Sequence, residues 1–249
     1  MRLTQPDSTM QSFRYYDFFV GGVVAVLLCS NLIGPGKVCE YDFPLLGVLA
    51  FSAGNLFFPI GYIFGDVLTE VYGYARARRA IWAGFGAMIF ATVMTYVVLA
   101  MPVADDPYNK VLQPALETVF GNTWRIVLGS IVAYWVGDFL NSIVMAKMKV
   151  WTRGKHLWSR TIGSTVVGQF ADSALFYPIS FLGLWSTQAL ISAVLFNFAF
   201  KVLLEVVLTP LTYWIVNKLK KVEGVDTYDT VTSFNPFSLK DEGDRRTQA

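Results

Sequence analysis

Six long apolar segments make up most of this chain, and they constrain its fold more than any other feature of the sequence. An α-helix needs about 20 apolar residues to cross the hydrocarbon core of a bilayer, and each segment reaches roughly that length. Hydrophobic residues account for 54% of the 249 residues and charged residues for only 15%, against about 25% in a soluble domain. The segments lie near residues 16–34, 44–72, 79–101, 124–148, 161–184 and 188–217. The sequence therefore predicts an all-α membrane protein with six transmembrane helices.

The second segment, residues 44–72, is longer than a straight helix perpendicular to the membrane requires. It contains Pro59, and a proline inside a helix removes one backbone hydrogen bond and bends the axis. We therefore expect one tilted or kinked helix over this segment, with the break at Pro59.

Basic residues gather in every second connection between the segments. The connections after the second, fourth and sixth segments hold eleven of them, whereas the main opposite loops hold Lys37 and Lys110. Because cytoplasmic loops carry an excess of lysine and arginine, both termini are predicted to be cytoplasmic. The eleven residues are Arg76, Arg78, Arg79, Lys147, Lys149, Arg153, Lys155, Arg160, Lys218, Lys220 and Lys221.

The apolar segments also divide the chain into regions. Residues 1–15 are polar and form a predicted cytoplasmic N-terminal segment, and no small-residue cleavage site follows the first apolar run, so we expect that run to stay in the mature protein. Residues 16–217 form the predicted six-helix transmembrane domain. Residues 218–249 are charged and poor in large apolar groups, which predicts a disordered cytoplasmic tail.

One short pattern occurs three times inside the apolar segments: G-D-V-L-T-E from Gly65, G-D-F-L-N-S from Gly137 and G-Q-F-A-D-S from Gly168. Each copy places a carboxylate or amide directly after a glycine and a second polar group three residues later, so that both groups share one helix face. An ionised group within a membrane segment is costly unless it faces a protein-lined or watery cavity. The pattern therefore predicts an interior that handles a polar ligand.

The second and third copies supply the strongest candidates for ligand contact. They place two acids and two amides at comparable depth in neighbouring segments. With a single cation at this depth, two acids leave an uncompensated negative charge, which a cationic ligand, a coupling proton or protonation of a carboxyl group could offset. The four residues are Asp138, Asn141, Gln169 and Asp172.

The cation is Lys201 of the sixth segment, which lies one helical turn from Glu205. Residues at this spacing can pair with each other. Two interpretations stay open for the pair, contact with the ligand or an internal salt bridge. Asn31 in the first segment is likewise open between ligand contact and a hydrogen bond that holds two helices together.

The first copy of the pattern contains Asp66 and Glu70, near the predicted cytoplasmic end of the second segment. For Glu70 we favour a structural lock, in which a carboxylate binds arginines across a tight turn. Asp66 stays open as a ligand contact. The arginines of the predicted lock are Arg76, Arg78 and Arg79.

The residue sets of common enzymes and metal sites are missing from the sequence. The one histidine, His156, lies in a basic loop, and Cys29 and Cys39 form no metal-binding spacing. The chain has no G-x-x-x-x-G-K-[ST] phosphate loop, and a net charge of +2 gives no indication of nucleic-acid binding. We therefore predict a protein that is not an enzyme and uses no metal or cofactor.

Several motifs resemble those of one known family. They are S-N at 30–31, G-D-V-L-T-E-V-Y-G at 65–73 followed by A-R-R-A-I-W-A-G-F at 77–85, A-Y-x-x-G-D-x-x-N at 133–141, G-Q-x-x-D-S at 168–173 and F-K-V-L-x-E-x-x-x-x-P at 200–210. In order and spacing, over about residues 15–215, they resemble the queuosine precursor transporter family, also called the vitamin-uptake-type (VUT) transporters or the DUF165 group.

The resemblance implies a fold similar to the six-helix S-components of energy-coupling-factor transporters, in the cytoplasmic (inner) membrane of a bacterium. It also implies import of a 7-deazaguanine base (preQ0, preQ1 or queuine) for the queuosine modification of transfer RNA. A carboxylate can accept the N–H groups of such a base, an amide or lysine can donate to its carbonyl, and an aromatic ring can stack on its face. The aromatic candidates are Tyr134, Trp135, Phe170 and Phe176.

Assembly and energy supply stay open. The chain is either a solitary importer or an S-component-like binding subunit for another vitamin-like molecule that depends on a separate ATPase module. A membrane scaffold whose polar network serves only assembly is a third interpretation. Glycine pairs allow close packing within or between subunits, so a homodimer is also open. These glycines are Gly21, Gly22, Gly84 and Gly86.

Overall fold

Seven α-helices and a β-hairpin make up the part of the chain that the computed structural model describes, residues 13–33, 38–43, 47–121 and 124–238. A 3₁₀ turn (Ala53–Leu56) precedes α2, and a π-helical turn (Leu68–Tyr72) follows it. The helices are α1 (Tyr16–Leu32), α2 (Phe58–Val67), α3 (Tyr74–Leu99), α4 (Pro107–Phe120), α5 (Trp124–Trp151), α6 (Leu157–Phe181) and α7 (Thr187–Glu223).

Three of these helices, α3, α5 and α7, are long and apolar enough to cross a membrane. The shorter α1 is apolar as well. In α6, buried Thr161, Ser164 and Thr165 make one face polar. The helix composition is thus that of a multi-pass membrane protein. The six crossings and the cytoplasmic location of the termini stay predictions.

The first part of the second predicted segment differs from the prediction. Residues 47–52 form β2 (Gly47–Ser52), which pairs antiparallel with β1 (Val38–Phe43) in a register that places Val38 opposite Ser52. The helix begins only at Phe58, with Pro59 in its first turn, where a proline is tolerated because its missing amide hydrogen has no helical partner. A helix that starts at Pro59 needs no kink there, so the kinked helix over 44–72 is wrong, and the all-α description holds for the bundle but not for this hairpin.

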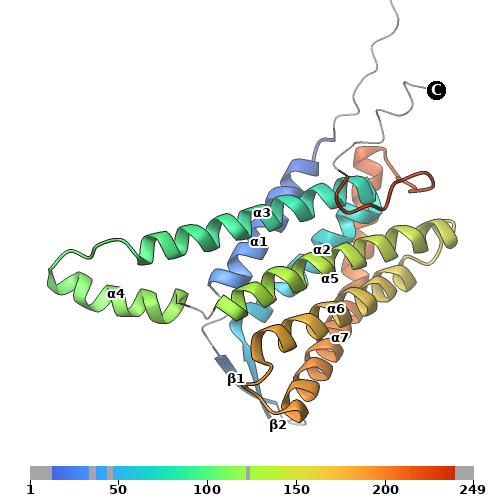
Figure 1. Ribbon diagram of the computed structural model, residues 1–249. Helices are drawn as coiled ribbons and strands as arrows, with labels where there is room; N and C mark the ends of the chain where they lie inside the picture. The colour runs from blue at the N-terminus through green and yellow to red at the C-terminus, as the bar shows by residue number, and fades with distance from the viewer. Residues whose placement is uncertain (1–12, 34–37, 44–46, 122–123, 239–249) are drawn as a thin grey trace, which may run out of the picture.

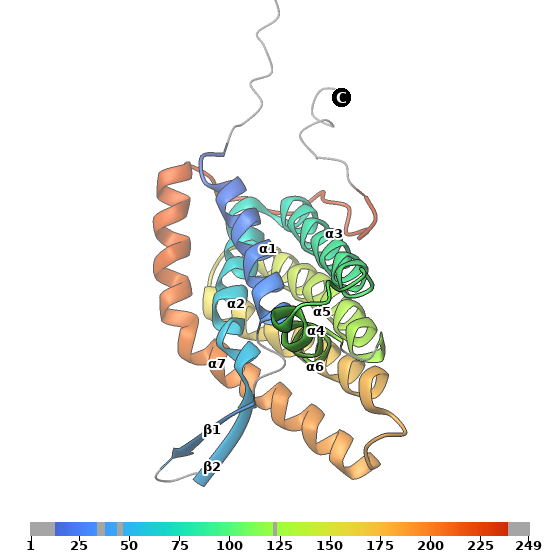
Figure 2. The ribbon, with the colours of Figure 1, turned by 90° about the vertical axis from the view of Figure 1, so that its left-hand side faces the viewer.

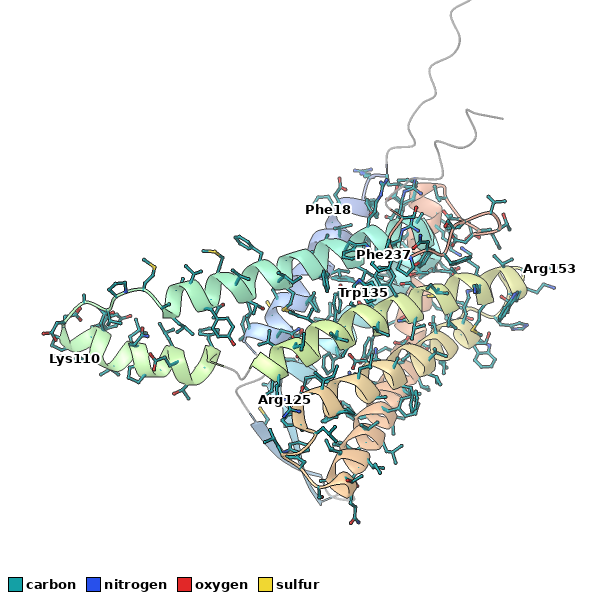
Figure 3. All side chains as sticks on the ribbon, viewed as in Figure 1. Phe18, Lys110, Arg125, Trp135, Arg153 and Phe237 are labelled. Carbon is teal, nitrogen blue, oxygen red and sulfur yellow. The ribbon has the colours of Figure 1, made fainter. Side chains whose placement is uncertain are left out.

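Helices α5 and α6 run side by side, and α6 continues into α7 through a short connection (Figure 1). On the other side, α3 extends away from the bundle and α4 folds back beneath it, with Lys110 near the tip of this arm and Arg153 at the opposite end of the molecule (Figure 3). Viewed from the arm side, α1 and α2 lie between α3 and the bent helix α7 (Figure 2). Helix α4 lies in the connection between the third and fourth predicted segments.

Two of the four glycines that suggested close packing lie at contacts between helices of the same chain. A Cβ atom built at Gly22 would lie 2.5 Å from the ring of Phe64, and one at Gly84 would lie 2.5 Å from the hydroxyl of Tyr134. Gly21 and Gly86 have no such neighbour within 4 Å in the part of the chain that the structure describes. The close approaches therefore join α1 to α2 and α3 to α5.

Residues of the predicted disordered tail pack against the bundle. Helix α7 extends to Glu223, and the buried Asp229 accepts hydrogen bonds from the backbone amide of Tyr74 at 3.1 and 3.2 Å, which caps the start of α3. Arg78 donates to the carbonyls of Ser233 and Asn235, each at 2.9 Å. The expected disorder is thus wrong for residues 218–238. Residues 1–12 and 239–249 lie outside the described part of the chain.

Candidate functional site

The second and third copies of the glycine pattern meet where α5 crosses α6. A Cβ atom built at Gly168 would lie 2.8 Å from the Cβ of Asn141 and 2.9 Å from the carbonyl oxygen of Gly137. One at Gly137 would lie 3.1 Å from the Cβ of Asp172. Side chains at these two positions would therefore push the helices apart. The glycines let the backbones touch, and this contact fixes the polar residues that follow each glycine.

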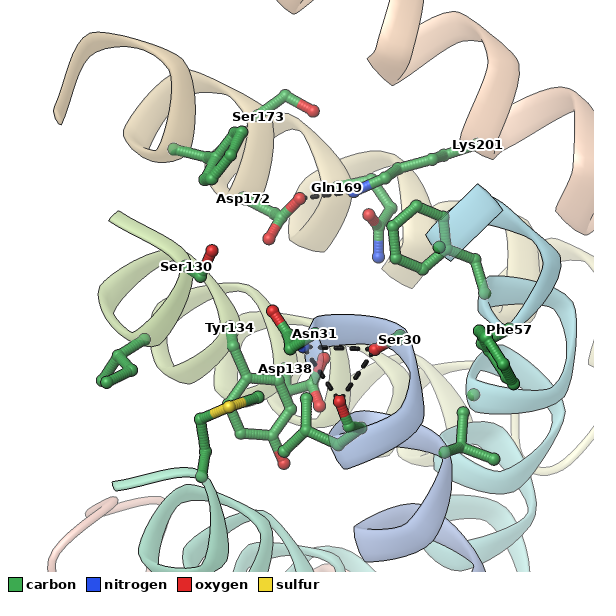
Figure 4. Close-up of a pocket in the computed structure, with 18 of the residues that line it drawn as sticks. Ser30, Asn31, Phe57, Ser130, Tyr134, Asp138, Gln169, Asp172, Ser173 and Lys201 are labelled. Carbon is green, nitrogen blue, oxygen red and sulfur yellow. Dashed lines mark hydrogen bonds and ion pairs between the residues drawn. The ribbon is translucent and has the colours of Figure 1, made fainter. Parts of the chain in front are cut away.

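Beside this crossing lies a cavity of about 580 Å³ between α1, α2, α3, α5, α6 and α7, with the end of α4 at its edge. Figure 4 shows its polar side chains, which come from four of these helices and converge on one space. They include Ser30, Asn31, Ser130, Asp138, Asn141, Gln169, Asp172, Ser173, Asn197 and Lys201. The predicted contacts Asn31, Asp138, Asn141, Gln169, Asp172 and Lys201 are all among the lining residues.

Lys201 binds Asp172 and not Glu205. Its ammonium nitrogen lies 2.5 Å from a carboxylate oxygen of Asp172 and 4.6 Å from the ring centre of Phe58. Of the two interpretations left open for this pair, the internal salt bridge with Glu205 does not form, because the lysine side chain extends to a different helix. Asp138 lies across the cavity (Figure 4) and forms no ion pair within the described residues. The uncompensated charge in the cavity is therefore that of Asp138.

Other acceptors in the cavity also lack partners. The side-chain carbonyl oxygens of Asn141 and Gln169 are buried and accept no hydrogen bond from the part of the chain that is described. Asn31, in contrast, donates to the carbonyl of Leu27 at 3.0 Å and to the hydroxyl of Ser30 at 3.1 Å. A buried polar group without a partner costs free energy. The cavity therefore offers an excess of hydrogen-bond acceptors to a ligand rich in N–H donors.

Two of the four predicted aromatic contacts lie at the cavity. Tyr134 and Phe176 line it. Trp135 is outside, packed against Phe139 and Phe237 with ring centres 5.1 and 5.5 Å apart, because a residue next to Tyr134 on a helix points about 100° away from it. Phe170 is also outside.

The side chain of Phe170 packs against Phe198, at 5.8 Å between ring centres, and it is 53% exposed. Phe58, Tyr62 and Asn197 also line the cavity and were not among the predicted contacts. Asn197 donates a hydrogen bond to the hydroxyl of Tyr177. Asn197 lies one helical turn before Lys201 on α7, which is a spacing that would have identified it.

Asp66 and Glu205, for which ligand contact stayed open, are not among the residues that line the cavity. Both are buried, each with 1% of its surface exposed. Their carboxyl groups lie against each other, and none of the four oxygens accepts a hydrogen bond from another described residue.

Glu70 forms the predicted lock, but with other partners. Arg160 of α6 holds both of its carboxylate oxygens at 2.7 Å, Lys220 of α7 lies 2.5 Å away and Lys149 of α5 lies 3.3 Å away. We call these three cations the basic cluster. Arg76 instead donates to the backbone carbonyl of Tyr72 at 3.3 Å and stacks on Phe13, and Arg78 donates to two carbonyl groups of the tail. Partnership of Glu70 with Arg76, Arg78 or Arg79 is therefore wrong.

Asp226 of the tail completes this lock. Its carboxylate lies 2.6 Å from Lys149 and 2.8 Å from Lys220. Partial burial acts to raise the pKa of the Asp226 carboxyl, but the hydrogen bonds from Lys149 and Lys220 outweigh it and lower the pKa. The lock thus ties the π-helical turn after α2, the helices α5, α6 and α7, and the tail together at one end of the bundle.

Comparison with known proteins establishes the family. Residues 52–215 match the family described as "Putative vitamin uptake transporter", and this range is more than half of the chain. The chain belongs to this family. Membership in a transporter family confirms that the protein is a transporter and not an enzyme.

Two relatives of this family member have a more specific name. A protein of Bacillus subtilis (strain 168) named "Probable queuosine precursor transporter" is 32% identical over 188 residues, which cover 75% of this chain and 78% of the relative. A protein of the same name from Haemophilus influenzae (strain ATCC 51907 / DSM 11121 / KW20 / Rd) is 27% identical over 131 residues, 51% of each chain. These matches confirm the family resemblance. No solved structure matches the chain.

Proposed function

We propose that this protein imports a queuosine precursor, a 7-deazaguanine base such as preQ0, preQ1 or queuine, across the cytoplasmic (inner) membrane of a bacterium. The names of the two relatives support this substrate. The cavity of about 580 Å³ also suits a small molecule, since such sites measure about 300–1,000 Å³.

Asp138 is the observation that carries the proposal. It is an acid within an apolar helix, it faces the cavity, and it forms no ion pair within the described part of the chain. An ionised group in such a place marks a functional site by default. The ring N–H and the exocyclic amino group of a deazaguanine provide the two donors that one carboxylate can accept side by side.

The rest of the cavity suits the remaining groups of the base. The unpartnered carbonyl oxygens of Asn141 and Gln169 accept further N–H donors, and Lys201 donates to the carbonyl of the base while it remains bound to Asp172. Tyr134 and Phe176 provide aromatic surfaces on which a flat heterocycle can stack. In this arrangement Asp138 recognises the base, and Asp172 holds Lys201 in position.

Binding of preQ0 to the purified protein tests the proposal, because a ligand that binds the native state raises its thermal stability. Asp138→Asn removes a charge-assisted hydrogen bond and should weaken binding about 10- to 100-fold. Asp105→Asn is the matched control, because the side chain of Asp105 is 86% exposed and bound to Lys110 on the arm. Equal affinity of the Asp138→Asn variant and the parent would contradict the assignment.

The direction of transport rests on the orientation, with six crossings and both termini cytoplasmic. A cysteine in place of Asp106 on the arm should react with a membrane-impermeant thiol reagent added to cells, and a cysteine in place of Lys155 should not. The reverse pattern would refute this orientation. Uptake by vesicles that contain only this protein would support a solitary importer, whereas binding without uptake would favour the S-component-like subunit.

A further inference from the structure

The paired carboxyl groups of Asp66 and Glu205 are the most unusual feature outside the cavity. Asp66 lies on α2 and Glu205 on α7, two helices that lie beside each other (Figure 2). Each residue is 1% exposed, and no described residue donates a hydrogen bond to any of the four oxygens. Two carboxylates in contact in a medium of low dielectric constant cannot both stay ionised. The pair must therefore hold a positive charge.

The nearby cations are already bound to other acids. Lys201, one turn before Glu205, is bound to Asp172, and Arg160 is bound to Glu70 through two hydrogen bonds. Besides Glu205, the charged groups that act on Asp66 are Glu70 and Arg160, which neutralise each other. None of the described cations forms an ion pair with Asp66 or Glu205, so a proton taken up from solution can supply the missing positive charge.

The side chains around the pair favour a proton over a metal ion. A calcium ion needs six to eight oxygen ligands, and no group of three His, Cys, Asp or Glu side chains that could hold a metal occurs among the described residues. A proton needs only the two carboxyl groups, because the protonated one donates to the other. No further ligands are required.

A polar residue connects the pair to the cavity. Tyr62 lies one turn before Asp66 on α2 and lines the cavity. Its buried hydroxyl has no hydrogen-bond partner among the described residues, and it lies within the electrostatic reach of Asp138, Asp172 and Glu205. The hydroxyl group can accept and donate a proton, so it is placed to relay one between the cavity and the pair.

The backbone near the pair is irregular on both helices. The π-helical turn Leu68–Tyr72 begins two residues after Asp66, and α7 contains Pro210 five residues after Glu205. Single π-helical turns occur frequently at functional sites, and a proline removes a hydrogen bond from the helix that contains it. Both carboxyl groups thus lie next to segments where a helix can bend.

We propose that Asp66 and Glu205 share one exchangeable proton and that its binding and release couple import to the proton gradient; this rests on the proposed transport function. In the binding step one carboxylate takes up a proton and becomes a carboxylic acid that donates to its neighbour. In the release step the proton leaves the pair, and the carboxylate is restored. Nothing else is consumed.

Transport by the purified full-length protein in proteoliposomes tests the coupling. An imposed pH gradient should drive accumulation of preQ0 by the parent, whereas an imposed sodium gradient should not. Asp66→Asn and Glu205→Gln should each abolish gradient-driven accumulation while they retain preQ0 binding and exchange of preQ0 across the membrane. Accumulation driven by the pH gradient in either variant at the rate of the parent would overturn the proposal, as would accumulation by the parent driven by sodium alone.

A second measurement requires no substrate. Infrared difference spectra of the parent between neutral and high pH, where exposed carboxyl groups stay ionised, should show the carbonyl band of a protonated carboxylic acid, and this band should be weaker in both variants. A parent spectrum without the band in this pH range would overturn the proposal even where a variant does not fold. If preQ0 does not bind while the band is present, the proposed substrate fails and the proton site stands.

Discussion

The crossing of α5 and α6 allows a quantitative prediction for Gly168→Ala. The added Cβ would lie 2.8 Å from the Cβ of Asn141 and 2.9 Å from the carbonyl oxygen of Gly137. Carbon atoms pack at about 3.5 Å or more, so the first contact is about 0.7 Å too short. Overpacking of this kind costs about 1–3 kcal/mol. Both atoms belong to backbone or to the base of a side chain, so neither can turn away, and the helices must separate.

Gly86→Ala is the matched control, because Gly86 is also inside a helix and has no neighbour within 4 Å of its built Cβ in the described structure. Each substitution gains about 1 kcal/mol of helix propensity, which cancels in the comparison. Gly168→Ala should therefore be about 1–3 kcal/mol less stable than Gly86→Ala. Gly137→Ala, with its closest contact at 3.1 Å, should fall between them.

Thermal unfolding of the three variants in one detergent measures this order, at about 2–4 °C per kcal/mol for a chain of this size. The same samples provide a second measurement, because separation of α5 and α6 moves Asp138 away from Gln169 and Asp172 and should weaken preQ0 binding. Gly86→Ala should bind as the parent does. Equal melting temperatures for Gly168→Ala and Gly86→Ala would refute the close backbone contact.

Three further predictions concern the charged groups. Lys201→Met should destabilise the protein by up to about 3–5 kcal/mol, and by less than this because Asp172 is partly exposed. Adding Asp172→Asn should restore the melting temperature but not the affinity for preQ0. Restored affinity would show that Lys201 does not contact the ligand. Asp229→Ala should cost about 0.5–2 kcal/mol through the lost cap of α3, and an unchanged melting temperature would show that the tail does not stabilise the fold. Because the pKa of Asp226 is lowered in the folded protein, its stabilising effect is present at neutral pH and is lost only below about pH 4. The stability difference between the parent and Asp226→Asn should stay constant from neutral pH to about pH 5 and shrink below that, and a difference that shrinks already near neutral pH would contradict the lowered pKa.

The sequence predicted the cavity better than it predicted the partners of its charges. Polar residues three apart after a glycine share a helix face, and this rule correctly placed Asp138, Asn141, Gln169 and Asp172 at one cavity. Spacing within one helix suggested Glu205 as the partner of Lys201, but the long lysine side chain reaches α6. Contacts between distant parts of a chain depend on how its helices pack, and sequence spacing does not contain that information.

The same limit explains the other differences. Glu70 has arginines close by in sequence, yet its strongest partner is Arg160, 90 positions away. The apolar run of residues 47–52 is short, and a short apolar run does not distinguish a strand from a buried helix. The tail has the composition of a disordered segment, but its carbonyl groups accept hydrogen bonds from Arg78 and Trp82. Composition does not show such bonds, since they depend on donors exposed at the end of the bundle.

Helix α2 with its π-helical turn and helix α7 both contribute residues to the cavity, the carboxyl pair and the lock. Tyr62, Asp66 and Glu70 are spaced four residues apart on α2 and its π-helical turn, so they form one face. The first lines the cavity, the second belongs to the carboxyl pair and the third to the lock. Helix α7 also contributes one residue to each of these three sites.

These residues of α7 are Lys201, Glu205 and Lys220. A movement of α2 relative to α7 would thus change substrate contacts, the carboxyl pair and the lock together. Loss of a proton from the pair restores repulsion between its two carboxylates, and this repulsion acts directly between the same two helices. The proton site therefore lies where one charge can influence both the cavity and the opposite end of the bundle.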